Sequence, residues 1–552
     1  MSHASYRVIS ATDFHQMPRS QRRGIPRFLQ QERVVKTITR ILSALNAKPT
    51  IVAFATVCKT LARPVLDVLW ESQDDWFQLL KCFPPDVWED RDNAFVSCHS
   101  SVLTYSLPMF ISLGIHFQHF LRNPAPAEWA RLRIYASRMV RMNVMLLQKS
   151  ISISSFQILN MEANNSPLFP KLRTLSWRTG WDFVPFISSF LSPSLSSVTI
   201  YFADDNFNVL RVPALYNLAN ECRHLEEVHL FGLTLDRGVD DAMSDLLLKS
   251  ANTVRVLKLY PSIQEKVTYV AMQLPNLREL GTEFTALPSI LPPSVFPALQ
   301  SLNLWIREGT PWAQLLPYLR GPVLENIAVY CADKTLGTVP SMLGRSLSGA
   351  HLHRTLTSLE FVGQGIRWSL NHETLLPFFS FRNLTRLSLL GHCQAGECHF
   401  SLTDRDVTGL SFAMPNLTFL GLGSHPCNAG TTQVTFASLV ILSMNCRYLE
   451  QLRLHFDATT IVKQTLAKSK NTLPRSGEAT LFTSTSRCRL NTLHVGSIPF
   501  PDIPNSRWII ATALLHIFPH LIQIKHGGGS IWKDVLDCIT ICRMIPTAIP
   551  GP

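Results

Sequence analysis

The hexapeptide Leu384-Thr385-Arg386-Leu387-Ser388-Leu389 has apolar residues separated first by two polar residues and then by one. Alternation at every second position is typical of a strand with one buried face. Leu387 and Leu389 should therefore point to one side of the strand, and Arg386 and Ser388 to the other. Such a strand is not stable alone, because its apolar side must be buried by neighbours of the same kind.

The same pattern recurs along most of the 552-residue chain. Its thirteen anchors lie 22 to 41 residues apart, which is typical of an irregular leucine-rich repeat. Helix-like stretches such as 212–222 and 434–444 separate the copies. We therefore predict an α/β fold, with a small helical module followed by a solenoid of parallel strands backed by helices. The strong anchors are Leu172, Leu225, Val254, Leu277, Leu299, Leu356, Leu384, Leu417 and Leu449, and the weaker ones are Leu195, Leu324, Leu490 and Leu521.

In such a solenoid the apolar anchors point inward, and the residues between them line a concave surface. Strands ~4.8 Å apart over twelve intervals give a surface on the order of 58 Å long. Its side chains mix charge, amide and hydroxyl groups without a dominant sign, which favours a protein partner over a phosphate backbone. The predicted target-binding residues are Arg173, Glu227, His229, Arg255, Lys258, Asn303, Thr385, Arg386 and Arg453.

A different pattern occupies the stretch from Ile51 to Asp75, IVAFATVCKTLARPVLDVLWESQDD. Pro64 suits the first position of a helix, so the stretch should form two short helices that Pro64 separates. A module of this size should be too small to bury a core alone, and we expect it to dock on the repeats or on a partner. In the first of these helices, one face carries Ile51, Phe54, Ala55 and Cys58. An earlier helix has an apolar face with Val34, Ile38, Ile41, Leu42 and Leu45.

Val57-Cys58-Lys59, Leu66-Asp67-Val68-Leu69-Trp70 and Asp74-Asp75 resemble the second half of the F-box of basidiomycete fungal F-box proteins. With the repeats downstream, the order resembles an F-box/leucine-rich-repeat protein. The resemblance implies the substrate-recognition adaptor of a Skp–cullin–F-box ubiquitin ligase, acting in ubiquitin-dependent protein degradation. The module would dock on a Skp-type adaptor, and through it on a cullin scaffold, while the solenoid binds a target protein. The docking residues implied are Ile38, Ile41, Leu42, Val57, Cys58, Lys59, Pro64 and Leu66.

The run EWARLRIYA at 128–136 resembles a helix that follows the F-box in the same fungal group. We predict five segments in the chain. They are a disordered basic tail at 1–32, the F-box-like module at 33–82, a helical linker or cap at 83–160, the solenoid at 161–545 and a tail at 546–552. The polar residues 86–92 should form a loop, and residues 468–489, rich in Ser, Thr and Lys, an inserted loop.

The net charge of +12 is concentrated in two segments. Residues 1–40 hold eight Lys/Arg against two Asp/Glu, and residues 121–149 hold six against one. A basic arm can contact nucleic acid or an anionic surface, but a solvated tail is the favoured interpretation. There is no run of eighteen apolar residues and no hydrophobic signal core, so we expect a cytoplasmic or nuclear protein without a membrane segment.

The sequence contains few candidate catalytic or metal-binding residues. The twelve cysteines are scattered without a CxxC pair, which predicts reduced thiols. His392-Cys393 and Cys398-His399 have the composition of a zinc site, but they directly follow a repeat strand, and a variable loop is the favoured interpretation. His526-Gly527-Gly528-Gly529 would need a G-x-S-x-G nucleophile elbow, which the sequence lacks. We expect a non-catalytic adaptor subunit with no metal and no cofactor.

Two other functions stay open. The chain could be a protein-binding scaffold without ligase association, which the missing Leu-Pro opening of the F-box favours. A nucleic-acid-associated protein would instead use the basic N-terminal arm, and its affinity would fall steeply with salt. Nucleic acid is the less favoured partner.

Overall fold

The structure is a computed structural model that describes residues 31–45, 47–73, 77–93, 115–145, 149–165, 167–179, 181–202, 208–232, 236–307, 312–319, 324–331, 339–349, 352–364, 369–392, 399–424, 432–463, 465, 487–496, 500, 503, 505–526 and 531–544. Two compact units divide the chain, one ending at Ser262 and the other beginning at Ile263.

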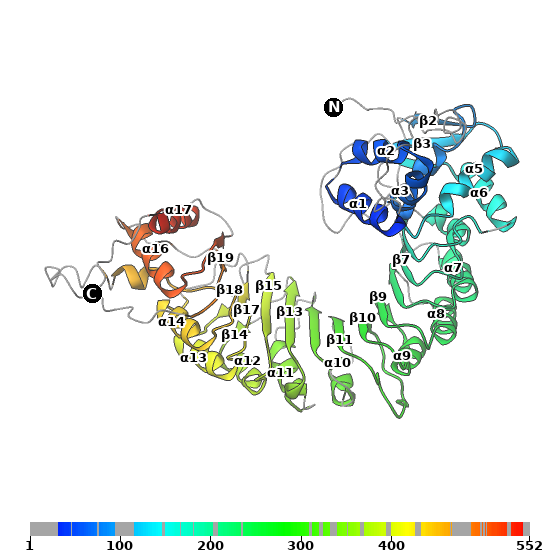
Figure 1. The fold of residues 1–552 in the computed structure, drawn as a ribbon. Helices are drawn as coiled ribbons and strands as arrows, with labels where there is room; N and C mark the ends of the chain where they lie inside the picture. The colour runs from blue at the N-terminus through cyan, green and yellow to red at the C-terminus, as the bar shows by residue number, and fades with distance from the viewer. Residues whose placement is uncertain are drawn as a thin grey trace. The chain divides into compact units, whose positions relative to one another are not determined.

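The first unit holds a helical module, a small side sheet and the first repeats (Figure 1). Its main sheet has the order β1-β4-β6-β7-β8-β9, and each neighbouring pair is parallel. Its elements are α1 (Glu32–Ala44), α2 (Lys48–Thr56), α3 (Lys59–Glu71), β1 (Ser72–Gln73), α4 (Phe77–Leu80), β2 (Trp88–Asn93), β3 (Ile115–Phe120), α5 (Pro126–Ala136), β4 (Arg141–Met145), β5 (Lys149–Ile151), α6 (Ile153–Asn165), β6 (Thr174–Thr179), the 3-10 helix η5 (Trp181–Phe190), β7 (Ser197–Phe202), α7 (Asn208–Glu221), β8 (Glu227–Phe231), α8 (Arg237–Lys249) and β9 (Val256–Ile263).

The second unit consists of repeats, and its sheet has the order β10-β11-β12-β13-β15-β17-β18-β19-β20, again parallel. Its elements are α9 (Glu265–Met272), β10 (Glu279–Phe284), β11 (Ser301–Ile306), α10 (Trp312–Leu315), η6 (Leu316–Tyr318), β12 (Asn326–Cys331), α11 (Val339–Gly349), η7 (Leu352–Arg354), β13 (Ser358–Gln364), β14 (Ser369–Leu370), α12 (His372–Leu375), η8 (Leu376–Ser380), β15 (Arg386–His392), β16 (His399–Phe400), α13 (Asp404–Ala413), β17 (Phe419–Ser424), α14 (Phe436–Asn445), β18 (Gln451–Leu454), β19 (Thr492–Gly496), α16 (Ser506–Ile517), β20 (Gln523–His526) and α17 (Ile531–Met544).

The thirteen predicted strands are all present, and each begins two residues after its anchor. Every anchor is at most 2% exposed. The repeats stack in phase, since Leu387 pairs with Leu359 on one side and with Leu420 on the other. The predicted helices at 212–222 and 434–444 are confirmed as α7 and α14. Helices line one face of each unit's sheet (Figure 1), and we call the opposite face the open face.

The residue after each anchor continues the backbone ladder beyond the strands. The Thr385 N–H donates to the Thr357 carbonyl at 2.8 Å, and the Thr418 N–H donates to the Thr385 carbonyl at 2.7 Å. The Thr385 hydroxyl also donates to the Thr357 carbonyl, at 3.1 Å. The residues that follow the anchors therefore form a row with a structural role, because they satisfy the hydrogen-bonding requirement of the peptide groups where each strand begins.

Carboxylates link successive repeats on the helical side of the second unit. Asp404 accepts hydrogen bonds from the Thr435 N–H at 2.8 Å and from the Thr435 hydroxyl at 2.7 Å. Asp406 accepts from the Thr403 N–H at 2.7 Å and lies 2.7 Å from His372 Nδ1. These groups cap helix N-termini, where N–H groups lack partners within the helix.

The N-terminal module buries a core of its own, contrary to the sequence prediction. Val35 of α1, Ile51 and Ala55 of α2, and Leu61 and Val65 of α3 form one buried cluster. The predicted face of Ile51, Phe54, Ala55 and Cys58 is confirmed, but it packs inside the module. Three helices suffice because each contributes apolar residues to a shared centre.

Pro64 does not begin a helix. It lies buried inside α3, and the chain breaks earlier, at Cys58, which is extended with φ −164° and ψ 163°. The proline at a helix start is Pro49, in the first turn of α2. A proline inside a helix removes one backbone hydrogen bond, and here the packing of its ring into the module core offsets that loss.

The region predicted as a helical linker at 83–160 contains strands as well as helices. Residues 88–93, expected within or beside a loop, form β2, which pairs antiparallel with β3, and β3 pairs parallel with β5. The repeat sheet also begins before residue 161, with β1 and β4. The sequence pattern did not reveal the β4 repeat, because Met139 stands where the other repeats have leucine or valine, and Met139 is fully buried.

Within the part of the chain that the structure describes, no helix has the length and apolar content needed to cross a bilayer. Most of the predicted N-terminal tail (1–30), most of the insertion (466–486) and the C-terminal tail (545–552) lie outside the described residues.

The strand faces predict contrasting effects for neighbouring residues of β15. Leu387→Ala should lower the free energy of unfolding by roughly 2–5 kcal/mol, because it opens a cavity at a fully buried anchor. Arg386→Gln should lower it by only about 0.5–1 kcal/mol, because it removes one exposed contact with a ring. Urea unfolding of the full chain measures both. Similar losses would mean that the two strand faces are assigned the wrong way round.

Candidate functional site

The eight predicted docking residues separate into distinct sets in the folded module. The prediction that Pro64 contacts the adaptor is wrong, because its ring is buried and is not accessible to a partner. The core-packed set is Leu42, Cys58 and Pro64, the half-buried set is Ile38 and Leu66, and the exposed set is Ile41, Val57 and Lys59.

Apolar side chains remain exposed on the module beside its own core. Ile41 of α1 is 55% exposed, Leu45, which follows α1, is 71% exposed, and Val57, which follows α2, is 53% exposed. The face of α1 that packs inward carries Val35 and Thr39 instead. Of the apolar stripe predicted for this helix, Ile41 and Leu45 are exposed, Val34 and Ile38 are half-buried, and Leu42 packs against the module core.

Two carboxylates of α3 join the module to the first repeat. Asp67 accepts from Arg138 and lies 3.3 Å from Lys36 Nζ of α1. Glu71 Oε1 lies 3.9 Å from a guanidinium nitrogen of Arg141 in β4, and Glu71 also accepts from Arg40 of α1 at 2.9 Å. Since α3 runs directly into β1, which pairs with β4, the module is fixed to the sheet by charge and by backbone pairing together.

The two motifs that resemble the fungal family meet at this junction. The Trp70 ring lies 5.0 Å from the Tyr135 ring, at an interplanar angle of 40°. The Val140 N–H donates to the Glu71 carbonyl at 2.9 Å. Asp67 and Trp70 of the Leu-Asp-Val-Leu-Trp motif therefore make contacts within the chain, a role that the sequence did not indicate.

The open face holds six of the nine predicted target-binding residues at strand positions. The prediction is wrong for the other three, because each is the residue that directly follows an anchor and directly precedes a strand, namely β6, β9 or β15. The alternation of side chains between the two faces begins only at the first residue of the strand. The six are Glu227, His229, Lys258, Asn303, Arg386 and Arg453, and the three are Arg173, Arg255 and Thr385.

An aromatic row crosses the open face of the first unit. Tyr201 and Phe231 stack with centroids 4.4 Å apart, and Phe231 and Tyr260 stack at 4.9 Å. The Arg178 guanidinium lies 4.7 Å above the Tyr201 ring. Sequence reasoning missed this row, although alignment of the repeats places all four residues six positions after their anchors. Tyr and Arg are the residue types enriched in protein interfaces.

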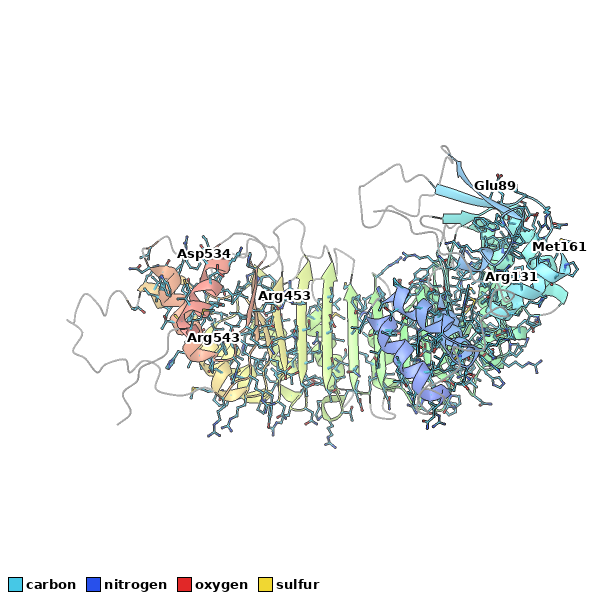
Figure 2. The ribbon with its side chains drawn as sticks, turned by 45° about the horizontal axis from the view of Figure 1, so that its top comes forward. Glu89, Arg131, Met161, Arg453, Asp534 and Arg543 are labelled. Atoms are coloured by element: carbon cyan, nitrogen blue, oxygen red, sulfur yellow. The ribbon has the colours of Figure 1, made fainter. Side chains whose placement is uncertain are left out.

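The open face of the second unit carries a shorter aromatic pair and several charges. Trp305 and Tyr330 stack at 4.8 Å. Glu283 is almost fully buried, and burial raises its pKa while nearby Arg307 opposes the rise. Arg307 Nε lies 3.3 Å from Glu283 Oε2, close enough for an ion pair but outside hydrogen-bond geometry. Figure 2 shows Arg453 over the strands near the C-terminal end of the sheet.

Among the described residues, no group of three or more His, Cys, Asp or Glu is placed to hold a metal ion. Residues 393–398 of the possible zinc motif and residues 527–529 of the glycine motif lie outside the described ranges. The two surfaces above are suited to binding partners, because they present apolar, aromatic and charged side chains over extended areas.

No protein-family model matches the chain, and no curated protein matches its sequence. Among solved structures, it is similar to a chain in the crystal structure of the Rad7 and Elc1 complex in yeast. That similarity has 14% sequence identity and a TM-score of 0.37, and it covers 68% of this chain and 83% of the other. A likeness at that level carries no argument about function, so the F-box and fungal assignments stay predictions.

The cysteines predict selective labelling. Burial raises the pKa of Cys82, Cys222 and Cys446 to about 12, and that of Cys488 to about 11. Thiolate is the reactive form, so these four should resist dithionitrobenzoate at pH 8 until the chain unfolds. The half-buried Cys58 and Cys542 should react before these four. Peptide mass mapping distinguishes the sites, and labelling of Cys222 as fast as Cys58 would contradict the burial.

The raised pKa values of these four thiols also predict the direction in which stability changes with pH. The folded chain keeps these thiols neutral, whereas unfolding releases them to a pKa near 9. Their contribution to stability is therefore complete below pH 9 and is lost as the pH rises toward 12.

The junction predicts a role for Asp67 in stability. Asp67→Asn should lower the free energy of unfolding by about 1–3 kcal/mol, because it leaves the partly buried Arg138 without a carboxylate. Asp245→Asn is a matched control, since Asp245 pairs with Lys249 on an exposed helix surface, where such a pair contributes about 0.3–0.5 kcal/mol. Equal shifts of the thermal midpoint in the two variants would exclude a special role for the junction.

Proposed function

We propose that this chain is the substrate-recognition subunit of a Skp–cullin–F-box type ubiquitin ligase. The module of α1, α2 and α3 docks on a Skp-type adaptor, and the open face of the repeats captures a target protein. Ubiquitin transfer is carried out by other subunits. The observation that carries the proposal is the set of apolar side chains that the module leaves exposed after burying its own core.

The docking part rests on the location of these side chains. Ile41 lies in α1, Leu45 directly follows α1 and Val57 directly follows α2, so all three belong to the module. Single exposed apolar residues are ordinary, but several on one small module are a feature of interaction surfaces. Full burial of each side chain would contribute about 1.5–3 kcal/mol. The F-box resemblance of the same segment supports a Skp-type partner.

The target-binding part rests on the open face. Within each unit the repeats align their outward side chains in rows, so neighbouring strands present one extended surface. Tyr, Trp and Arg occur on it, and these residues contribute most to binding energy in protein interfaces. The anchors of each strand face the helices and make no contribution to recognition.

A helical cap is the second candidate role for the module. The contacts of Asp67, Glu71 and Trp70 favour it, since they tie α3 to the first repeat. Solenoids need such caps to cover their terminal repeats. A cap without a docking function would leave the chain as a protein-binding scaffold.

Substitution of the exposed apolar residues separates the two roles. Ile41→Lys combined with Leu45→Lys should abolish co-purification of a co-expressed Skp-type adaptor, while the thermal midpoint stays unchanged, because both side chains already border solvent. Deletion of the module is a poorer test, since it would also remove β1 from the sheet.

The matched control is Ile290→Lys combined with Phe412→Lys, two exposed apolar residues of the second unit at 79% and 69% exposure. This variant should retain the adaptor. If the unaltered chain does not co-purify with the adaptor, or if both variants behave alike, the module is a cap and the ligase proposal is wrong.

A further inference from the structure

The charges at open-face positions of the second unit are distributed unevenly along the sheet, although Arg307, just after β11, lies beside Glu283. Strands β10 to β13 carry the carboxylates Glu279, Glu283 and Glu360 at open-face positions. From β15 to β20 the described open-face positions carry no carboxylate, and they hold Arg386, Arg453, His494 and Lys525. The prediction that the open face has no dominant sign of charge is therefore wrong for strands β15 to β20.

Arg453 occupies the centre of the basic part. The strand register places Gly421 on one side of it and His494 on the other, with Lys525 one strand further. The side chain is half-buried, and burial lowers the pKa of Arg453. Among the described residues it has no carboxylate partner. A partly desolvated cation attracts an incoming carboxylate more strongly than a fully hydrated one does.

Arg386 is held in place without being neutralised. Its guanidinium carbon lies 3.9 Å from the centroid of the Phe419 ring. The ring in turn covers Gly421, where an added Cβ would come within 3.0 Å of Phe419 Cε1. The glycine thus makes room for the ring, and the ring positions the cation. A positioned guanidinium loses less conformational freedom when it binds an anion.

The cations lie in two neighbouring open-face rows of the sheet, with Arg453 and Lys525 in one row and Arg386 in the row two residues nearer the strand start. Two strand intervals separate β15 from β18, and two more separate β18 from β20, which corresponds to ~10 Å for each step. In a peptide with the extended polyproline II conformation, side chains three residues apart lie on the same side of the chain and are separated by ~9 Å. We propose that the open face of β15 to β20 binds an extended, carboxylate-rich segment of the target protein, with acidic residues three apart meeting Arg386, Arg453 and Lys525. This inference rests on the proposed function of target capture.

A protein segment suits this surface better than a nucleic acid. Phosphates along one strand recur every ~3.4 Å of helix axis, so a track with cations ~10 Å apart would leave most of them without contacts. Apolar and amide side chains also lie between the cations, at Leu390, Phe419, Gln451 and Gln523. Such a mixture is usual in protein interfaces.

A fluorescent peptide with Asp at every third position among Ser and Gly is the probe, titrated against the full chain. The same peptide with Asn in place of Asp should not bind. Arg386→Gln combined with Arg453→Gln should weaken binding of the Asp peptide by about tenfold or more, because it removes two charge-assisted contacts. Thermal melting of this variant verifies that the fold is retained.

The control is Arg345→Gln combined with Arg405→Gln, on α11 and α13, which makes the same change in net charge on exposed helical positions. It should alter binding by less than about twofold, since distant charges are screened by salt. The inference is overturned if the unaltered chain does not bind the peptide, if both variants weaken binding equally, or if oligothymidylate binds in place of the peptide. Failure of the proposed function would appear separately, as loss of the adaptor from the unaltered chain.

Discussion

The parallel pairing of short strands around buried leucine anchors supports every other feature of this molecule. Each strand has too few residues to be stable alone, and each anchor is shielded only when the next repeat stacks on it in phase. The row of peptide groups after the anchors extends the ladder, as the contacts between Thr357, Thr385 and Thr418 illustrate. Because the interior positions are occupied by packing, the outward positions are free to vary, and recognition is confined to them.

The helical module depends on the same sheet. Its three helices bury their own centre, but α3 continues into β1, and Asp67 and Glu71 pair with basic residues around the first repeat. The module is consequently attached to the first repeat by ion pairs and by backbone pairing.

The open faces of the two units differ in chemistry. The first unit presents Tyr201, Phe231 and Tyr260 in a stacked row, which offers a large and already ordered contact area. The second unit places carboxylates on its early strands and cations on its later ones. Ordered aromatic groups lower the entropic cost of binding, while separated charges select the orientation of a partner. The aromatic row and the separated charges both arise because side chains at equivalent positions of successive repeats lie next to one another on the open face.

The sequence alone determined the repeat, its thirteen strands and its buried anchors, because a period-two pattern specifies which side chains must be covered wherever the strands pair. The sequence also located the helical module. Only the tertiary structure decided which face of each helix packs inward, since Val35 and Ile41 are both apolar and only the placement of α3 selects Val35. The strand register likewise decided that Arg386, Arg453 and Lys525 share one surface, although 139 residues separate the first from the last in the chain. Local patterns specify what must be buried, and long-range pairing determines what is brought together.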